Sequence, residues 1–156
     1  LGRILANKLN YNFIDFDEYI EDKEDKTVAQ IFTEKGEIYF RKLESAYLKE
    51  ILDIKNSVIS LGGGTPCYAN NMDLINDSDG TGVYINVPVG ELTSRLWKER
   101  LHRPLLKHQD TEEKLEEFIR KHLFERSFYY NQADIKIAAG DKSELKLVEE
   151  ILSRLL

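Results

Sequence analysis

Short apolar runs alternate along the chain with longer segments whose apolar positions recur at helical spacing. The short runs predict strands at residues 12–16, 57–61, 83–87 and 135–139. The longer segments predict helices at residues 1–9, 18–24, 27–35, 37–54, 71–75, 89–100, 110–131 and 143–156. Strands that alternate with helices are typical of a parallel sheet covered by helices. No internal repeat or linker divides the chain, so we expect a single domain over residues 1–156.

Several of the predicted helices carry signals at their ends. Thr27 and Gln30 form a capping box for one helix, and Gly36 follows its last turn. Asp110 with Glu113 indicates the start of the longest helix. The predicted apolar stripe of the helix at 37–54 consists of Phe40, Leu43, Tyr47, Ile51 and Ile54.

Composition narrows the function classes. The chain has 156 residues with 22 Lys and Arg against 28 Asp and Glu, a net charge of −6. This acidic balance argues against a nucleic-acid-binding surface. No apolar run approaches the roughly 20 residues that cross a membrane, so no membrane partner is expected. The single cysteine, Cys67, fits a reducing compartment, and a cytoplasmic location is expected.

Two carboxylates stand at the end of the first predicted strand. Asp15 and Asp17 are two residues apart, which in a strand places both on one face about 6.6 Å from each other. At the carboxyl end of a parallel strand, such a pair suits a divalent metal and a substrate hydroxyl. The alternative, favoured for an isolated Asp-x-Asp, is that Asp17 caps the next helix and Asp15 lies in a turn.

Glycines and arginines supply further candidates. Gly62, Gly63 and Gly64 directly follow a strand, and three glycines let a ligand reach backbone N–H groups. Arg126 falls on the apolar face of its predicted helix, where its charge needs either a partner anion or an exit to solvent. Arg41 lies beside the apolar stripe of its own helix, and a salt bridge to a nearby glutamate is the simplest interpretation.

A basic, irregular segment follows residue 100. Arg103-Pro104-Leu105-Leu106 lies within it, with Arg95 shortly before. Guanidinium groups on such a loop suit the closing of a lid over phosphates, whereas a solvated charged loop is the alternative.

Taken in order, these motifs closely resemble the shikimate kinase family. The resemblance lies in Phe13-Ile14-Asp15-Phe16-Asp17, Gly36-Glu37, Phe40-Arg41-Lys42-Leu43-Glu44, Ile59-Ser60-Leu61-Gly62-Gly63-Gly64, Arg103-Pro104-Leu105-Leu106 and Glu125-Arg126-Ser127-Phe128-Tyr129. It implies an α/β P-loop NTPase fold of the nucleoside-monophosphate-kinase type, a three-layer parallel sheet with helices on both faces. The implied activity moves the γ-phosphate of ATP to the 3-hydroxyl of shikimate with Mg²⁺, in aromatic amino-acid (chorismate) biosynthesis.

The resemblance also implies roles for individual residues. Asp17 would bind the shikimate hydroxyls and orient or deprotonate the attacking one, while Asp15 would hold Mg²⁺ through water. Shikimate's carboxylate would be clamped by Arg41 and Arg126. The backbone of Gly63 and Gly64 would contact the substrate. Arg103, in a lid at about residues 100–112, would reach the transferred phosphate, and Arg95 would contact the nucleotide. A monomer is expected.

One part of the family pattern is missing. No G-x-x-x-x-G-K-[ST] occurs in the 156 residues, and the chain opens on Leu1 within a helical pattern. We therefore expect that the central strand and the phosphate-binding loop, about 15 residues, are absent and that the chain as given is inactive. The alternatives are a non-catalytic binding module of shikimate-kinase type and a related small-molecule kinase, such as a gluconate kinase.

Overall fold

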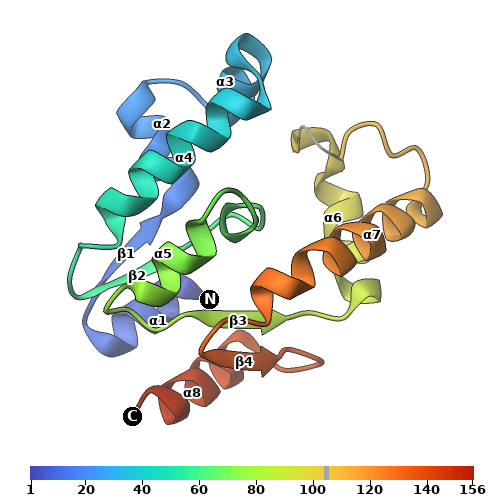
Figure 1. The fold of residues 1–156 in the computed structure, drawn as a ribbon. Coiled ribbons are helices and arrows are strands. Elements are labelled where there is room, and N and C mark those ends of the chain that lie inside the picture. The colour runs from blue at the N-terminus through green and yellow to red at the C-terminus, as the bar shows by residue number, and fades with distance from the viewer. Residues whose placement is uncertain (104–105) are drawn as a thin grey trace.

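A computed structural model of the chain describes residues 1–103 and 106–156. Its strands are β1 (Asn12–Asp15), β2 (Ser57–Ser60), β3 (Val83–Asn86) and β4 (Ile135–Ala138). Its α-helices are α1 (Gly2–Leu9), α2 (Phe16–Glu24), α3 (Val28–Lys35), α4 (Glu37–Ile51), α5 (Asn71–Asp77), α6 (Val89–Glu99), α7 (Glu112–Tyr130) and α8 (Glu144–Leu155). Two short 3₁₀ helices, η1 (Thr65–Cys67) and η2 (Arg100–His102), complete the order. The predicted alternation of strands and helices is confirmed (Figure 1).

The strands form two separate parallel pairs. In the first pair β1 runs beside β2, from Asn12 opposite Ser57 to Asp15 opposite Ser60. In the second pair β3 runs beside β4. Among the described residues, no ladder joins β2 to β3, so each of these two strands keeps one unpaired edge. Figure 1 shows the two pairs lying apart from each other.

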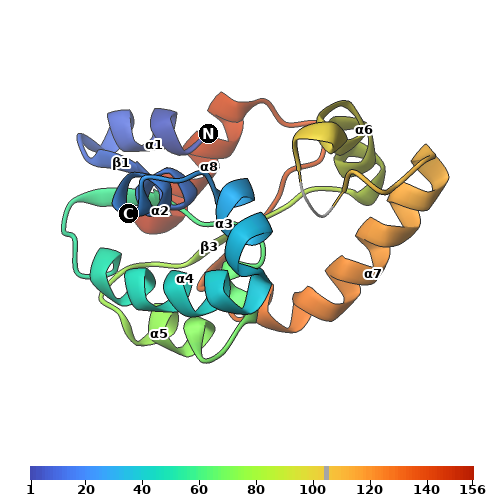
Figure 2. The same cartoon turned by 90° about the horizontal axis from the view of Figure 1, so that it is seen from above.

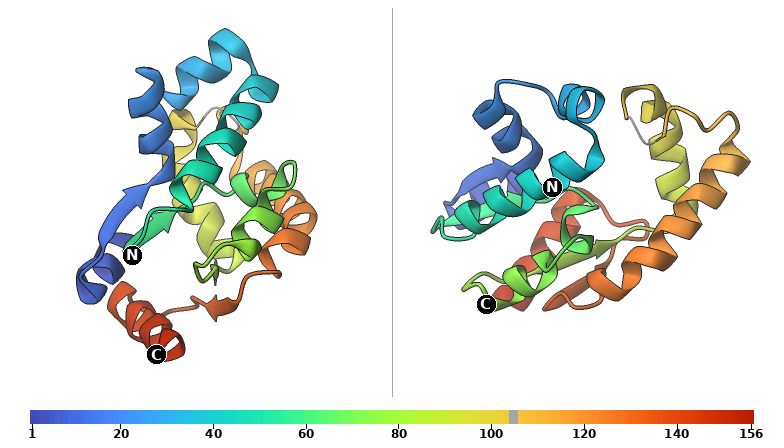
Figure 3. Two further views of the ribbon diagram at one scale, coloured as in Figure 1. Left: turned by 60° about the vertical axis from the view of Figure 1, so that its left-hand side comes forward. Right: turned by 45° about the horizontal axis from the view of Figure 1, so that its top comes forward.

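Helices cover both faces of the strands. Ile59 of β2 packs against the core that α2, α3, α4 and α5 share, whereas Val58 packs against the core of α1, α8 and β4. Because neighbouring residues of a strand point to opposite faces, this alternation gives three layers. Figures 2 and 3 show α4 and α5 on the side of the strands opposite α1 and α8. Each large side chain buried this way stabilises the fold by about 1.5–3 kcal/mol.

Helix ends follow the predicted capping with two corrections. The capping box of Thr27 and Gln30 is present at the start of α3. The long helix α7 begins one residue later than predicted, because Thr111 rather than Asp110 accepts the backbone N–H of Lys114. The helix α4 ends at Ile51 rather than at residue 54, since the chain must turn to align Ser57 with β1.

The apolar stripe predicted for α4 is rotated in the structure. Its buried positions are Phe40, Glu44, Leu48 and Ile51, whereas Ile54 is 38% exposed. This rotation brings a glutamate into the core and moves Arg41 toward the interior.

The pair α6 and α7 stands to one side of the strands and packs around its own small core (Figure 2). Leu106, Leu115 and Ile119 are buried there. The far end of α7 returns to the loop that follows β2 (Figure 3). Among the described residues, no helix is long and apolar enough to span a membrane.

Candidate functional site

The glycine loop that follows β2 is shaped by the side chains packed against it. None of Gly62, Gly63 and Gly64 has a positive φ, so a special backbone conformation does not explain them. A Cβ at Gly64 would lie 2.6 Å from Nη2 of Arg41, and one at Gly62 would lie 3.5 Å from Oδ1 of Asp17. A side chain at position 64 would therefore have to displace the guanidinium group of Arg41.

The middle glycine brings in the end of α7. A Cβ at Gly63 would lie 3.2 Å from Nη1 of Arg126 and 3.1 Å from the hydroxyl of Tyr130. The Tyr130 hydroxyl also donates a hydrogen bond to the carbonyl of Gly63. Tyr130 is a residue that the sequence analysis missed, and its position four residues after Arg126 on one helix face was the available signal. The loop thus joins residues from α2, α4 and α7, which are far apart in the sequence.

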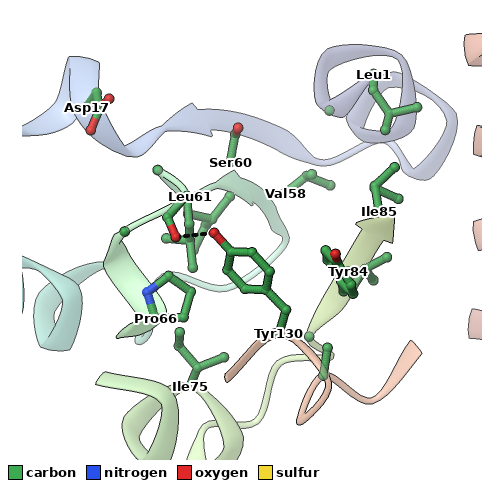
Figure 4. Close-up of a pocket in the computed structure, with 18 of the residues that line it drawn as sticks. Leu1, Asp17, Val58, Ser60, Leu61, Pro66, Ile75, Tyr84, Ile85 and Tyr130 are labelled. Carbon is green, nitrogen blue, oxygen red and sulfur yellow. Dashed lines mark hydrogen bonds between the residues drawn. The ribbon is translucent and has the colours of Figure 1, made fainter. Parts of the chain in front are cut away.

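Asp15 and Asp17 do not share a strand face as predicted. The strand β1 ends at Asp15, and Asp17 already belongs to the first turn of α2. Oδ1 of Asp15 accepts the backbone N–H groups of Asp17 and Glu18 at 3.0 and 3.2 Å, which makes Asp15 the helix cap. The alternative assignment of Asp17 as the cap is wrong as well, because the cap lies two residues earlier. Asp17 is left pointing into the cavity beside the glycine loop (Figure 4).

The carboxyl group of Asp17 is harder to ionise than an ordinary one. Burial raises its pKa above 3.8, and the charges of Asp15, Glu44 and Glu21 raise the pKa further. Only Arg41 acts in the opposite direction. A carboxyl group with a raised pKa in a cavity is suited to accept a proton.

Arg41 is held on several sides. Its Nη1 lies 2.9 Å from Oε1 of Glu44, and its guanidinium carbon lies 4.1 Å from the ring centre of Tyr68. Its Nε lies 3.7 Å from Oε1 of Glu37 and, although buried, has no hydrogen-bond partner among the described residues. The predicted salt bridge to a glutamate is confirmed, and the same guanidinium also lies against Gly64.

Glu44 is a residue that the sequence analysis missed. Its side chain is almost fully buried and binds both Arg41 and Thr65. The available signal was its position four residues after Phe40 and four before Leu48, in line with the buried face.

Arg126 differs from Arg41 in its surroundings. In the described part of the chain, no carboxylate lies within ion-pair distance of its guanidinium group, which faces the cavity at Gly63. The positive charge instead lowers the pKa values of Cys67 and Tyr130, although burial leaves both pKa values raised overall. An arginine so placed can bind an anion that enters the cavity.

The two remaining arginines lie further from the glycine loop. Arg103 lines the outer part of the cavity, and its guanidinium group binds Oε2 of Glu99 at 3.1 Å. Arg95 pairs with Glu91 on the exposed face of α6 and is not among the residues that line the cavity. The structure therefore does not bring Arg95 to the site. Pro104 and Leu105 of the predicted lid lie outside the described residues.

A cavity of about 1850 Å³ connects the glycine loop with the space between β2 and β3. Its polar end holds Asp17, Arg41 and Arg126. Its other end is apolar, and Figure 4 shows Val58 and Ile85 on opposite sides with Leu1 nearby. The unpaired edges of β2 and β3 border this apolar end.

The described residues offer little to a metal by themselves. They contain no group of three or more His, Cys, Asp or Glu side chains that could hold an ion. Asp15, the predicted metal residue, uses Oδ1 for its two cap hydrogen bonds and does not line the cavity. Mg²⁺ is commonly bound by one or two carboxylates together with water and substrate phosphates. Asp15 could take part in a site of this kind, in which the nucleotide supplies most of the ligands, but not in a site made of protein side chains alone.

Comparisons with known proteins agree on one family. A sequence model described as shikimate kinase matches residues 1–156. The shikimate kinase of Flavobacterium psychrophilum is 44% identical over 97% of this chain and 88% of that protein. The crystal structure of shikimate kinase from Bacteroides thetaiotaomicron matches with a TM-score of 0.85 at 39% identity, covering 99% of this chain and 86% of that one. The enzyme from Acinetobacter baumannii in complex with shikimate matches with a TM-score of 0.88 at 32% identity, covering 99% and 83%.

Proposed function

The chain belongs to the shikimate kinase family, and we propose that the cavity beside its glycine loop binds shikimate for phosphorylation of the 3-hydroxyl by ATP. One observation carries this proposal. A carboxyl group from α2 and two guanidinium groups from α4 and α7 approach the same three glycines. Shikimate has a carboxylate at one end and hydroxyl groups at the other, which matches this division of charge.

We assign the carboxylate of shikimate to Arg41 and Arg126. A guanidinium group binds a planar carboxylate through two parallel hydrogen bonds, and two such groups fix its orientation. Arg126 supplies positive charge that no carboxylate of the described residues neutralises, and Arg41 is already oriented by Glu44. The backbone N–H groups of Gly63 and Gly64 complete the binding of the substrate.

Asp17 then faces the hydroxyl end of the substrate. Its raised pKa makes its carboxylate a better proton acceptor than an ordinary aspartate. We propose that it orients the 3-hydroxyl and removes its proton as the oxygen attacks the γ-phosphate. The rest of the catalysis is positioning and charge stabilisation of the phosphate oxygens.

The nucleotide side of the site involves the lid at about 100–112. Arg103 would leave Glu99 and reach the transferred phosphate as the lid closes, which excludes water from the reaction. Asp15 would bind Mg²⁺ through water, and the ion would neutralise charge on the phosphates. A nucleotide role for Arg95 requires that its guanidinium group leave Glu91, its present partner on α6. A monomer in the cytoplasm stays a prediction.

The gap between the two strand pairs suggests where the missing part of the family pattern belongs. The unpaired edges of β2 and β3 face an apolar end of the cavity, and both neighbouring strand pairs are parallel. We propose that a fifth parallel strand fits there and leads into the phosphate-binding loop. Neither the strand nor the loop is assigned to any of the 156 residues, among which no G-x-x-x-x-G-K-[ST] occurs.

The proposed function predicts a specific ATP-dependent reaction. The protein expressed from its full natural reading frame should release ADP from ATP and Mg²⁺ only when shikimate is present. A coupled ADP assay with shikimate and gluconate as alternative substrates measures this. Gluconate turned over as well as shikimate would favour the sugar-acid kinase instead, and no turnover of either would favour a binding module.

Alanine at Gly64 is expected to weaken shikimate binding without harming the fold. The new Cβ would lie 2.6 Å from Nη2 of Arg41 and would displace the guanidinium group. Loss of a charged hydrogen-bonding group commonly raises KM about 10- to 100-fold. The measurement is KM for shikimate in the full-reading-frame protein, with KM for ATP alongside.

Gly90→Ala is the matched control for this substitution. No atom of the described residues lies within 4 Å of a Cβ at Gly90, which is in a helix where alanine is favoured. An unchanged KM for shikimate in Gly64→Ala would contradict the placement of Arg41 at the carboxylate.

A further inference from the structure

A buried hydrogen bond joins the residue after the glycine loop to the glutamate behind Arg41. The hydroxyl of Thr65 donates to Oε2 of Glu44 at 2.7 Å, while Oε1 of Glu44 binds Nη1 of Arg41 at 2.9 Å. The side chains of Thr65 and Glu44 are almost fully buried. Each oxygen of the Glu44 carboxylate therefore accepts one hydrogen bond, one from the neutral hydroxyl of Thr65 and the other from the charged guanidinium group of Arg41.

Thr65 is itself fixed by two further hydrogen bonds. The side-chain amide of Asn71 donates to the Thr65 carbonyl at 2.8 Å, and the hydroxyl of Ser45 donates to Oδ1 of Asn71 at 2.8 Å. Asn71 is fully buried. These bonds tie η1 to α4 and α5, so the Thr65 hydroxyl has a defined position relative to Glu44.

We propose that Thr65 is a positioning residue that keeps the guanidinium group of Arg41 available to the substrate carboxylate, by occupying the second oxygen of Glu44. This inference rests on the assignment of Arg41 to that carboxylate. A buried carboxylate oxygen without a donor is costly, and it takes the nearest available donor. Without Thr65 that donor is Arg41, whose Nε has no hydrogen-bond partner in the part of the chain that the structure describes. The guanidinium group then turns onto Glu44 and away from the ligand.

The test compares shikimate with its neutral carboxamide, in which only the charged group is changed. Dissociation constants are measured by calorimetry on the protein from its full natural reading frame. Thr65→Val keeps the shape and removes the hydroxyl, and it should weaken binding of shikimate about tenfold. Binding of the carboxamide should change far less, because it does not depend on a charged pair with Arg41. Thr65→Ser should restore binding of shikimate.

A matched control is present in α6. Thr93 is also buried, but among residues 1–103 and 106–156 its hydroxyl binds only the carbonyl of Val89. Thr93→Val should therefore leave both dissociation constants unchanged. Should Thr65→Val fail to fold, Thr65→Cys, with its much weaker donor, takes its place with the same expected result.

The outcomes distinguish the role of Thr65 from the assignment of Arg41 to the substrate carboxylate, on which that role rests. Equal weakening of both ligands, or no weakening of either, in Thr65→Val would overturn the positioning role. Arg41→Ala is measured in parallel. If it leaves shikimate binding unchanged, the assignment of Arg41 to the carboxylate fails too. If it weakens binding while Thr65→Val does not, only the role of Thr65 is overturned.

Discussion

Asp17→Asn is expected to reduce the rate of shikimate phosphorylation by about 10²- to 10⁴-fold, the usual contribution of a positioned general base. Asparagine keeps the shape of the side chain but cannot accept the proton of the attacking hydroxyl. The pH profile gives a second readout in the unmodified protein. Because burial and three neighbouring carboxylates raise the pKa of Asp17, the acid limb of kcat/KM should lie above 3.8. An acid limb at or below that value would contradict the assignment.

The same substitution should stabilise the fold. A raised pKa means that the folded state binds the proton of Asp17 more tightly than the unfolded state does. The free energy of unfolding therefore falls as pH rises from 3.8 through the raised pKa, and the ionised carboxylate costs stability at neutral pH. Asp17 also lies in the first turn of α2, where a negative charge is favourable, and this effect opposes the expected stabilisation.

Thermal unfolding of Asp17→Asn checks this part of the prediction. The melting temperature at neutral pH should exceed that of the unmodified protein, and the difference should shrink as pH falls toward 3.8. Asp22→Asn on the same helix is the control, because Asp22 is exposed and lies outside the cavity. A lower melting temperature for Asp17→Asn at neutral pH would show that the carboxylate contributes to stability.

The sequence predicted the elements well because each depends on short-range patterns. The strands, the capping box at Thr27 and the apolar face of α7 were each predicted from residues close together in the sequence. The structure contains all three. Arg126 is the clearest case among the site residues. Its position on the apolar face of α7 predicted that its guanidinium group either binds an anion or extends to solvent. In the structure the guanidinium group lies beside the glycine loop.

What the sequence could not provide depends on contacts between distant segments. The bond from Tyr130 to the Gly63 carbonyl joins residues 67 positions apart, and that from Thr65 to Glu44 joins residues 21 apart. Neither position carries a local pattern that marks its partner. The error at Asp15 and Asp17 was different, because the strand ends at Asp15, one residue earlier than predicted, and the helix begins at Phe16. A change of element between two residues removes the alternation on which the prediction relied.

The 156 residues expressed alone are expected to bind shikimate but to transfer no phosphate to it. The groups proposed for shikimate come from α2, α4, α7 and the loop after β2, all within these residues. The lysine and the backbone N–H cradle that P-loop kinases use for the β- and γ-phosphates have no counterpart in the sequence. The two halves of the reaction should therefore separate, with substrate binding retained and ATP-dependent turnover lost.

Two measurements on the same preparation check this separation. Calorimetry with shikimate measures substrate binding, and Arg126→Ala should abolish the binding signal. Phosphate transfer is measured as the ADP released with shikimate minus the ADP released without it. This difference should be zero for the 156 residues alone and positive for the full-reading-frame protein. Shikimate-dependent ADP release from the 156 residues alone would mean that other groups bind the phosphates. The proposed fifth strand between β2 and β3 would then not be needed for the reaction, and its apolar space would require another explanation.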